Sequence, residues 1–168
     1  LVVSEMLERA DLDVAFGKVL HCEDERGLQS LGIPSLEMSL SALMRSPDTT
    51  KMYQSAMFMR RRVFEWIGPF ASELSTGRDF EYWLRMAATG FNFGYLDQIL
   101  ARTSPRSARH TGIAAQIVRQ QICFRYLHHL DRTQRVSFWK DYYVSAAASP
   151  EFASETLQTT DVTELIGR

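Results

Sequence analysis

The sequence predicts an α/β protein in which a partial, mixed β-sheet with flanking helices is followed by a C-terminal helical hairpin. Hydrophobic residues make up 45% of the 168 residues and charged residues 23%, as in chains that bury a core. Nine glycines and five prolines are too few for an all-β protein with many tight turns. Short apolar runs of strand length alternate with stretches of helical periodicity, which favours a mixed sheet.

The first third of the chain contains one strong strand pattern. Residues 1–9 read as the end of a helix, and the apolar run at 14–20 has the β-branched and aromatic residues of a buried strand. An acidic turn is expected at 23–27. Residues 28–54 lack sustained periodicity and predict a long irregular segment, which in a compact domain is commonly functional.

The middle of the chain gives the clearest patterns. A short strand is expected at 55–59 and a short helix at 63–67, which the following Gly-Pro pair should end. Apolar residues recur on one helical face across 80–88, so we expect a helix there that ends at Gly90.

The last third predicts two strands and two helices. Period-two alternation at 91–95 and a short apolar run at 99–102 indicate strands. Helical patterns follow at 112–130 and 133–148, and Asp131 is a suitable N-cap between them.

We therefore expect two consecutive parts. Residues 1–110 would form the α/β part, and residues 111–168 a helical extension.

Charge is balanced overall but uneven along the chain. The 19 basic and 20 acidic residues give a net charge of −1, so no general positive field would attract nucleic acid, and we expect no nucleic-acid partner. Residues 100–135 nevertheless carry seven arginines against a single aspartate. This region could bind an anion or phosphate, or form an ordinary solvated helix surface.

Cysteine and histidine positions do not suggest a metal or redox site. Cys22 and Cys123 lack the spacing of a zinc site and are expected to be buried thiols of a reducing compartment. His128 and His129 are adjacent, which favours a surface position over shared metal ligation. No apolar run reaches the roughly 20 residues of a membrane helix, so we expect a cytoplasmic protein, either free or at the inner face of the membrane.

Several ordered blocks within 57–110 resemble a known family. They match the C-terminal, acceptor-side half of family 2 glycosyltransferases with the GT-A fold, and a looser resemblance extends over 1–110. The matching blocks are Met57-Phe58-Met59-Arg60-Arg61, Val63-Phe64-Glu65-Trp66-Ile67-Gly68-Pro69-Phe70 and Gly77-Arg78-Asp79-Phe80-Glu81-Tyr82-Trp83-Leu84-Arg85-Met86-Ala87.

The resemblance implies a function in polysaccharide biosynthesis. The complete enzyme of which this chain would be a part, here called the parent, would be an inverting transferase. It would move a sugar from a nucleoside-diphosphate sugar to a glycan or lipid-linked acceptor, with Mg²⁺ or Mn²⁺ as cofactor. The nucleotide-binding half and its Asp-x-Asp metal loop would precede Leu1. We therefore expect this chain alone to bind neither metal nor donor and to be inactive.

The resemblance places the catalytic base of the family on Asp79. An inverting transfer needs a carboxylate that takes the proton of the acceptor hydroxyl as this hydroxyl attacks the anomeric carbon. The alternative is a purely structural capping box, Thr76-x-x-Asp79, at the helix start.

Acceptor contacts are expected from Arg78, Phe70 and Gly77. Arg78 replaces the usual Glu and could bind an acceptor phosphate or carboxylate, or simply be solvated. Phe70 could line the pocket or anchor its loop. In the same block, Trp83 and Leu84 are expected in the core, and Arg85 should pair with a neighbour.

The departing diphosphate would be held by basic residues after the last strand. The candidates are Arg102, Arg106, Arg109 and His110. The family's Arg-x-His element is altered here, because no histidine follows closely after Arg102. A bland alternative is a basic surface loop.

A function of another class is compatible with the same sequence. The C-terminal helical hairpin could bind a protein partner through its apolar face, with the glycosyltransferase-like part as a non-catalytic remnant.

Overall fold

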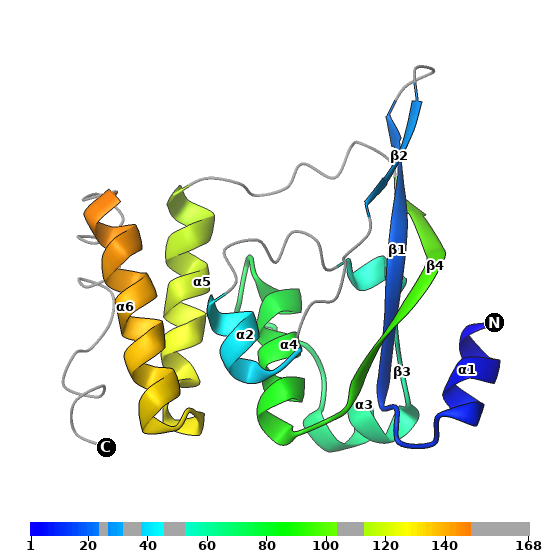
Figure 1. Cartoon of the computed structure of the whole chain (residues 1–168), viewed down its shortest axis with the longest axis horizontal. Coiled ribbons are helices and arrows are strands. Elements are labelled where there is room, and N and C mark those ends of the chain that lie inside the picture. Colours follow the sequence, from blue (N-terminus) through cyan, green and yellow to red (C-terminus); the bar gives the residue numbers. More distant parts are fainter. Residues whose placement is uncertain (24–26, 32–37, 46–52, 104–112, 149–168) are drawn as a thin grey trace. The chain divides into compact units, whose positions relative to one another are not determined.

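The computed structural model describes residues 1–23, 27–31, 38–45, 53–103 and 113–148. Within these ranges the chain combines a small mixed sheet with helices, which confirms the α/β class (Figure 1). The elements are α1 (Val2–Glu8), β1 (Val14–Glu23), β2 (Gly27–Leu31), α2 (Leu40–Arg45), η2 (Gln54–Ala56), β3 (Met57–Met59), α3 (Arg61–Ile67), α4 (Arg78–Thr89), β4 (Phe93–Thr103), α5 (Ile113–Arg125), η3 (Leu127–His129) and α6 (Arg132–Ala148).

The chain forms two compact units, each assembled from separate segments. The sheet unit comprises Leu1–Met38, Pro47–Pro69 and Arg85–Arg109, and the helical unit comprises Ser39–Ser46, Phe70–Leu84 and His110–Arg168. The last change of unit falls at the boundary expected near residue 110, but two earlier segments also group with the helical part. The division into 1–110 and 111–168 stays a prediction.

The sheet is built around β1. One edge of β1 pairs in parallel with β4, from Val14 opposite Phe93 to His21 opposite Thr103. The other edge is shared, because β3 pairs antiparallel with the start of β1 and β2 pairs antiparallel with its end. Figure 1 shows β1 and β4 running alongside each other. The sheet is therefore mixed, as expected.

β4 bulges where it passes Gly17. The pairing register shifts between Gly17 and Lys18 and again between Lys18 and Val19. A Cβ on Gly17 would lie 2.6 Å from Leu100 Cδ1 and 2.9 Å from the Gln98 carbonyl oxygen, so only glycine fits beneath the bulge.

Polar side chains bind the segments that lead into β1 and β4. Asp13 is 6% exposed; its carboxylate pairs with Arg62 at 2.6 Å and accepts a hydrogen bond from the Asn92 backbone N–H at 3.0 Å. Arg60 donates to the Leu12 carbonyl at 2.6 Å and to the Met6 carbonyl. These contacts connect α1, the start of β1, the start of α3 and the start of β4.

One apolar cluster of the sheet unit lies between α1 and the strands. Leu12, Ala15 and Leu96 are buried, and Val2 and Met6 of α1 pack against them. The hydrophobic effect thus holds α1 on the sheet, in agreement with the helix expected at 1–9.

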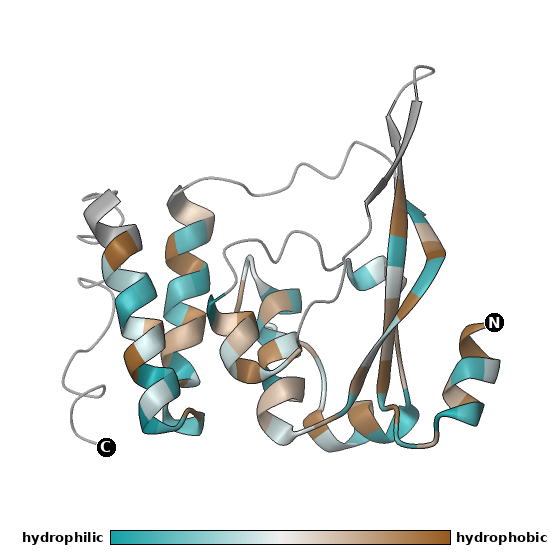
Figure 2. Cartoon of the chain, in the orientation of Figure 1, coloured by the Kyte–Doolittle hydropathy of each residue, from teal (hydrophilic) through white to brown (hydrophobic). Residues whose placement is uncertain are grey.

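The helical unit contains the predicted helical hairpin. α5 and α6 run antiparallel side by side (Figure 1), and Phe124 packs its ring 6.1 Å from Phe138 and 5.7 Å from Tyr142, between ring centroids. Figure 2 shows hydrophobic and hydrophilic residues mixed along α6. Val136 and Tyr143 are exposed on this helix, whereas Phe138 and Tyr142 are buried.

Several predicted elements are confirmed with small changes of length. α3 ends at Gly68, which has φ of 74°, and α4 ends at Gly90, with φ of 85°. The strand expected at 55–59 begins only at Met57, after the turn η2. The first long C-terminal helix ends at Arg125, because the chain then tightens into η3.

Two predictions about extended structure were wrong. The strands expected at 91–95 and 99–102 are one continuous strand, β4, because the residues between them form the bulge rather than a turn. The segment 28–54, expected to be irregular, contributes part of β2 and all of α2. β2 forms because pairing with β1 supplies its backbone hydrogen bonds.

None of the helices that the structure describes is both long and apolar enough to cross a membrane.

Candidate functional site

Asp79 lies in the first turn of α4, where its carboxylate is held in place. The chain enters the helix through Gly77, with φ of 73°, whose carbonyl accepts the Glu81 N–H at 2.9 Å. Asp79 Oδ1 accepts the Phe80 N–H at 2.9 Å, and the side chain is half-buried. The positive end of the helix dipole favours a negative charge at this position.

The capping box considered as the structural alternative is not formed in its expected register. It would require Thr76 as the N-cap and Asp79 as the third helical residue. α4 begins at Arg78, so Gly77 occupies the cap position and Asp79 is the second helical residue. The carboxylate still satisfies one backbone N–H at the helix start.

Arg78 turns back onto the loop that precedes the helix. Its side chain is exposed, and its guanidinium donates to the Leu74 carbonyl and, at 3.5 Å, to the Ser72 carbonyl. These contacts brace the loop against the start of α4. A role in acceptor binding stays a prediction for this residue.

Phe70 anchors the beginning of the same loop. Its ring stacks on Tyr82 with centroids 4.2 Å apart and an interplanar angle of 23°, and Tyr82 is 1% exposed. Of the two roles expected for Phe70, this stacking supports the one in which it anchors the loop. Trp83 and Leu84 are buried, which confirms that they are core residues.

Residues of α5, and Tyr126 directly after it, pack behind the first turn of α4. A Cβ on Gly77 would lie 2.9 Å from Ile122 Cδ1, so α5 approaches the backbone closely there. The Arg119 guanidinium lies over the Phe80 ring, 4.5 Å from its centroid.

A buried carboxylate forms the second link behind this turn. Glu81 is 7% exposed, and its Oε1 accepts the Tyr126 hydroxyl at 2.6 Å. Sequence reasoning missed Glu81, Arg119 and Tyr126. The one available signal was that Glu81 falls within the arc of α4 that also holds Phe80 and Leu84, an unusual place for an acid.

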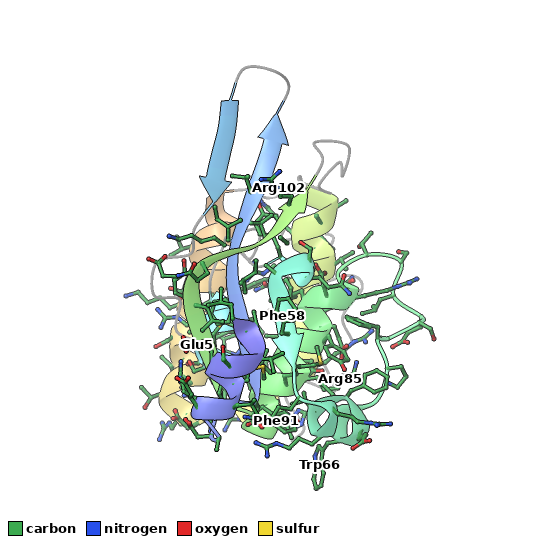
Figure 3. The ribbon with its side chains drawn as sticks, turned by 90° about the vertical axis from the view of Figure 1, so that its right-hand side faces the viewer. Glu5, Phe58, Trp66, Arg85, Phe91 and Arg102 are labelled. Atoms are coloured by element: carbon green, nitrogen blue, oxygen red, sulfur yellow. The ribbon has the colours of Figure 1, made fainter. Side chains whose placement is uncertain are left out.

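The basic residues expected at the diphosphate are only partly placed. Arg102 is exposed near the end of β4, in the sheet unit (Figure 3). Arg106, Arg109 and His110 lie outside the described residues. Gly77, Arg78, Asp79 and Phe70, in contrast, come together in the helical unit.

Arg85 pairs with its surroundings, as expected. It donates to the Ile67 carbonyl at 2.8 Å and the Pro69 carbonyl at 3.0 Å, and so satisfies acceptors at the C-terminal end of α3. Figure 3 shows Arg85 near α3, while Trp66, which is 77% exposed, projects away from that helix.

The side chains that commonly bind metals do not form a cluster in the described part of the chain. No group of three or more His, Cys, Asp or Glu that could hold a metal occurs within the described ranges, so the parent's Mg²⁺ or Mn²⁺ stays a prediction. Cys123 is fully buried, and burial raises the pKa of its thiol to about 12. The Cys22 side chain lies outside the described part. His128 and His129 are exposed, as expected. The pKa of His129 is lowered, because neighbouring residues cover part of its ring and because His128 lies beside it.

A scan of protein-family models and searches of curated proteins and of solved structures give no match to this chain. Its function is therefore inferred from its own residues.

Proposed function

We propose that this chain is the acceptor-side portion of an inverting, GT-A-type family 2 glycosyltransferase. The complete parent would transfer a sugar from a nucleoside-diphosphate sugar to a glycan or lipid-linked acceptor. The observation that carries the proposal is the position of the Asp79 carboxylate, which accepts a hydrogen bond from the Phe80 N–H at the start of α4. The chain enters this helix through Gly77, which has a positive φ.

In this reaction Asp79 takes up one proton. Its Oδ1 accepts the Phe80 N–H, and Oδ2 accepts the proton of the acceptor hydroxyl. The hydroxyl oxygen forms its bond to the anomeric carbon as the diphosphate leaves from the opposite face with the bonding electron pair. A carboxylate held by a backbone N–H loses little further freedom when the acceptor binds.

The neighbouring residues shape the acceptor side in this proposal. Arg78 and Phe70 hold the loop before α4, through the Leu74 carbonyl and the Tyr82 ring respectively. Arg102, with Arg106, Arg109 and His110, would neutralise the departing diphosphate. In this proposal, residues of the parent other than those described here would bind the Mg²⁺ or Mn²⁺.

The test is replacement of Asp79 in the complete parent enzyme. Asp79→Asn should lower the transfer rate by about a hundredfold to ten-thousandfold, because the amide cannot accept the proton, while donor affinity changes little. Glu73→Gln is the matched control, because the Glu73 side chain is 65% exposed and its ion pair with Arg125 is long, at 4.0 Å. Transfer by Asp79→Asn at close to the unmodified rate would remove Asp79 as the base.

One observation favours the protein-interaction alternative. Val136, Tyr143 and Val144 of α6 are 63%, 66% and 65% exposed, an unusual amount of apolar surface for one helix. If the hairpin is an interaction module and the rest a non-catalytic remnant, Val136→Lys combined with Tyr143→Lys should abolish partner capture, and the unmodified parent should show no sugar transfer. An Asp-x-Asp loop encoded upstream in the same reading frame would favour the transferase.

A further inference from the structure

The first turn of α4 has two sides with different surroundings. Phe80 and Glu81 follow Gly77 by three and four residues, so the three share one side of the helix. This side faces α5 and Tyr126. At about 100° per residue, Asp79 lies on the other side of the turn. The packing behind the turn therefore fixes where the Asp79 carboxylate is presented.

Arg119 is the residue that joins this turn to its support. Its guanidinium covers the Phe80 ring at 4.5 Å from the centroid, and its Nη2 donates to the Leu43 carbonyl of α2 at 2.9 Å. One planar cation thus connects α2, α4 and α5. A lysine would keep the charge, but it has neither the flat face nor the fork of donors that these contacts use.

The Arg119 contact lies next to the candidate base in sequence. Phe80 follows Asp79 directly, and the Phe80 N–H is the donor that holds the Asp79 carboxylate. A shift of Phe80 would therefore move both the donor and the carboxylate that it binds.

Resting on the function proposed above, we propose that Arg119 is a positioning residue for Asp79. From α5 it holds the first turn of α4 in the conformation that presents the base. α5 then belongs to the transferase site, not to an appended helical extension.

The first experiment measures the turn without any activity assay. Amide hydrogen exchange, followed residue by residue by NMR in the 168-residue chain, compares the unmodified protein with Arg119→Met, Arg119→Lys and the control Arg125→Met. Arg125 lies on the same helix and is exposed. Arg119→Met should accelerate exchange at Phe80 and Glu81 by about tenfold, Arg119→Lys by less, and Arg125→Met hardly at all.

The strand amides of Val14 and Val19 report on global unfolding, because both residues are fully buried in β1. Unchanged exchange at Phe80 and Glu81 would overturn the proposal. Equal acceleration at Val14 and Val19 would also overturn it, because the residue would then support the whole fold rather than the turn. If Arg119→Met fails to fold, Arg119→Lys gives the same comparison with a smaller change.

The second experiment uses the complete parent and separates this proposal from the first. A positioning role predicts that Arg119→Met lowers kcat at least tenfold with the donor KM within about twofold, and that Arg119→Lys recovers part of the loss. If Asp79→Asn keeps its transfer activity while Arg119→Met still loosens the turn, the assignment of Asp79 as the base fails. If Asp79→Asn is inactive but Arg119→Met changes neither exchange nor kcat, only the positioning role fails.

Discussion

Replacing Gly77 by alanine tests the close approach of α5 to the start of α4. Gly77 has φ of 73°, and a Cβ there would lie 2.9 Å from Ile122 Cδ1 and 3.6 Å from Val118 Cγ1. The positive φ alone costs an alanine about 1–3 kcal/mol. Because Ile122 is 1% exposed and cannot move into solvent, crowding adds about 1–3 kcal/mol. We expect Gly77→Ala to lower the free energy of unfolding by about 2–6 kcal/mol.

The two contributions can be separated by a matched set of variants. Gly90 also has a positive φ, but a Cβ there meets nothing within 4 Å, so Gly90→Ala should show the conformational cost alone. Ile122→Val removes the crowding Cδ1 atom, so Gly77→Ala should cost about 1–3 kcal/mol less in that background.

Urea titrations followed by tryptophan fluorescence measure the unmodified protein and its four variants, since Trp83 is 2% exposed and reports on the helical unit. A coupling between positions 77 and 122 below about 0.5 kcal/mol would refute the close approach, because independent sites add within that margin.

Two further predictions concern buried ionisable side chains. Asp13→Ala should lower the free energy of unfolding by about 2–3 kcal/mol, because it removes the buried carboxylate that binds Arg62 and the Asn92 N–H. Asp11→Ala, at an exposed neighbour, should cost little, and equal effects of the two variants in urea titrations would contradict the role of the buried carboxylate. In a Cys22→Ser background, Cys123 should resist thiol reagents at pH 8 until the chain is unfolded, since burial raises its pKa from 9.0 to about 12. The unfolded thiol ionises first, so stability should fall as pH rises from about 9 towards 12, and Cys123→Ala should remove that part of the fall; rapid labelling of the native protein would show that the thiol is accessible.

The helices were predictable because local patterns decide them. The apolar face of α4 and its glycine stop are visible in the sequence. Asp131 was expected as a cap, and it exchanges two hydrogen bonds with Gln134, of 2.8 Å and 3.0 Å, at the start of α6. Contacts within four residues along the chain leave a signature in its periodicity.

The bulge in β4 could not be predicted in the same way. Asp97 and Gln98 have the composition of a turn, yet both lie within one strand. The bulge depends on pairing with a strand far along the chain, where Gly17 lies opposite Leu96 and Lys18 lies opposite Ile99. Lys18 also forms an ion pair with Asp97, which holds the pKa of that carboxyl below its ordinary value. Only the register between the two strands reveals this arrangement.

In the candidate site, too, residues in a contiguous block could be predicted, and residues that act through long-range contacts could not. Asp79 was identified through a block of residues that are contiguous in sequence. Arg119 was counted only as one arginine of a basic region, because its contacts with Phe80 and Leu43 join positions 39 and 76 residues away. Periodicity shows which side of a helix is apolar but not which distant side chain covers it.

The central place of β1 in the sheet has a consequence for how the chain acquires its structure during translation. β1 can form its hairpin with β2 early, but its parallel partner begins only at Phe93, 79 residues after Val14. At about 5–20 residues per second, a ribosome needs roughly 4–16 seconds to synthesise that stretch. During this delay one edge of β1 and apolar residues such as Phe16 lack their final neighbours. High contact order of this kind slows folding, and chaperone binding to the nascent chain would be most useful in the interval before β4 emerges.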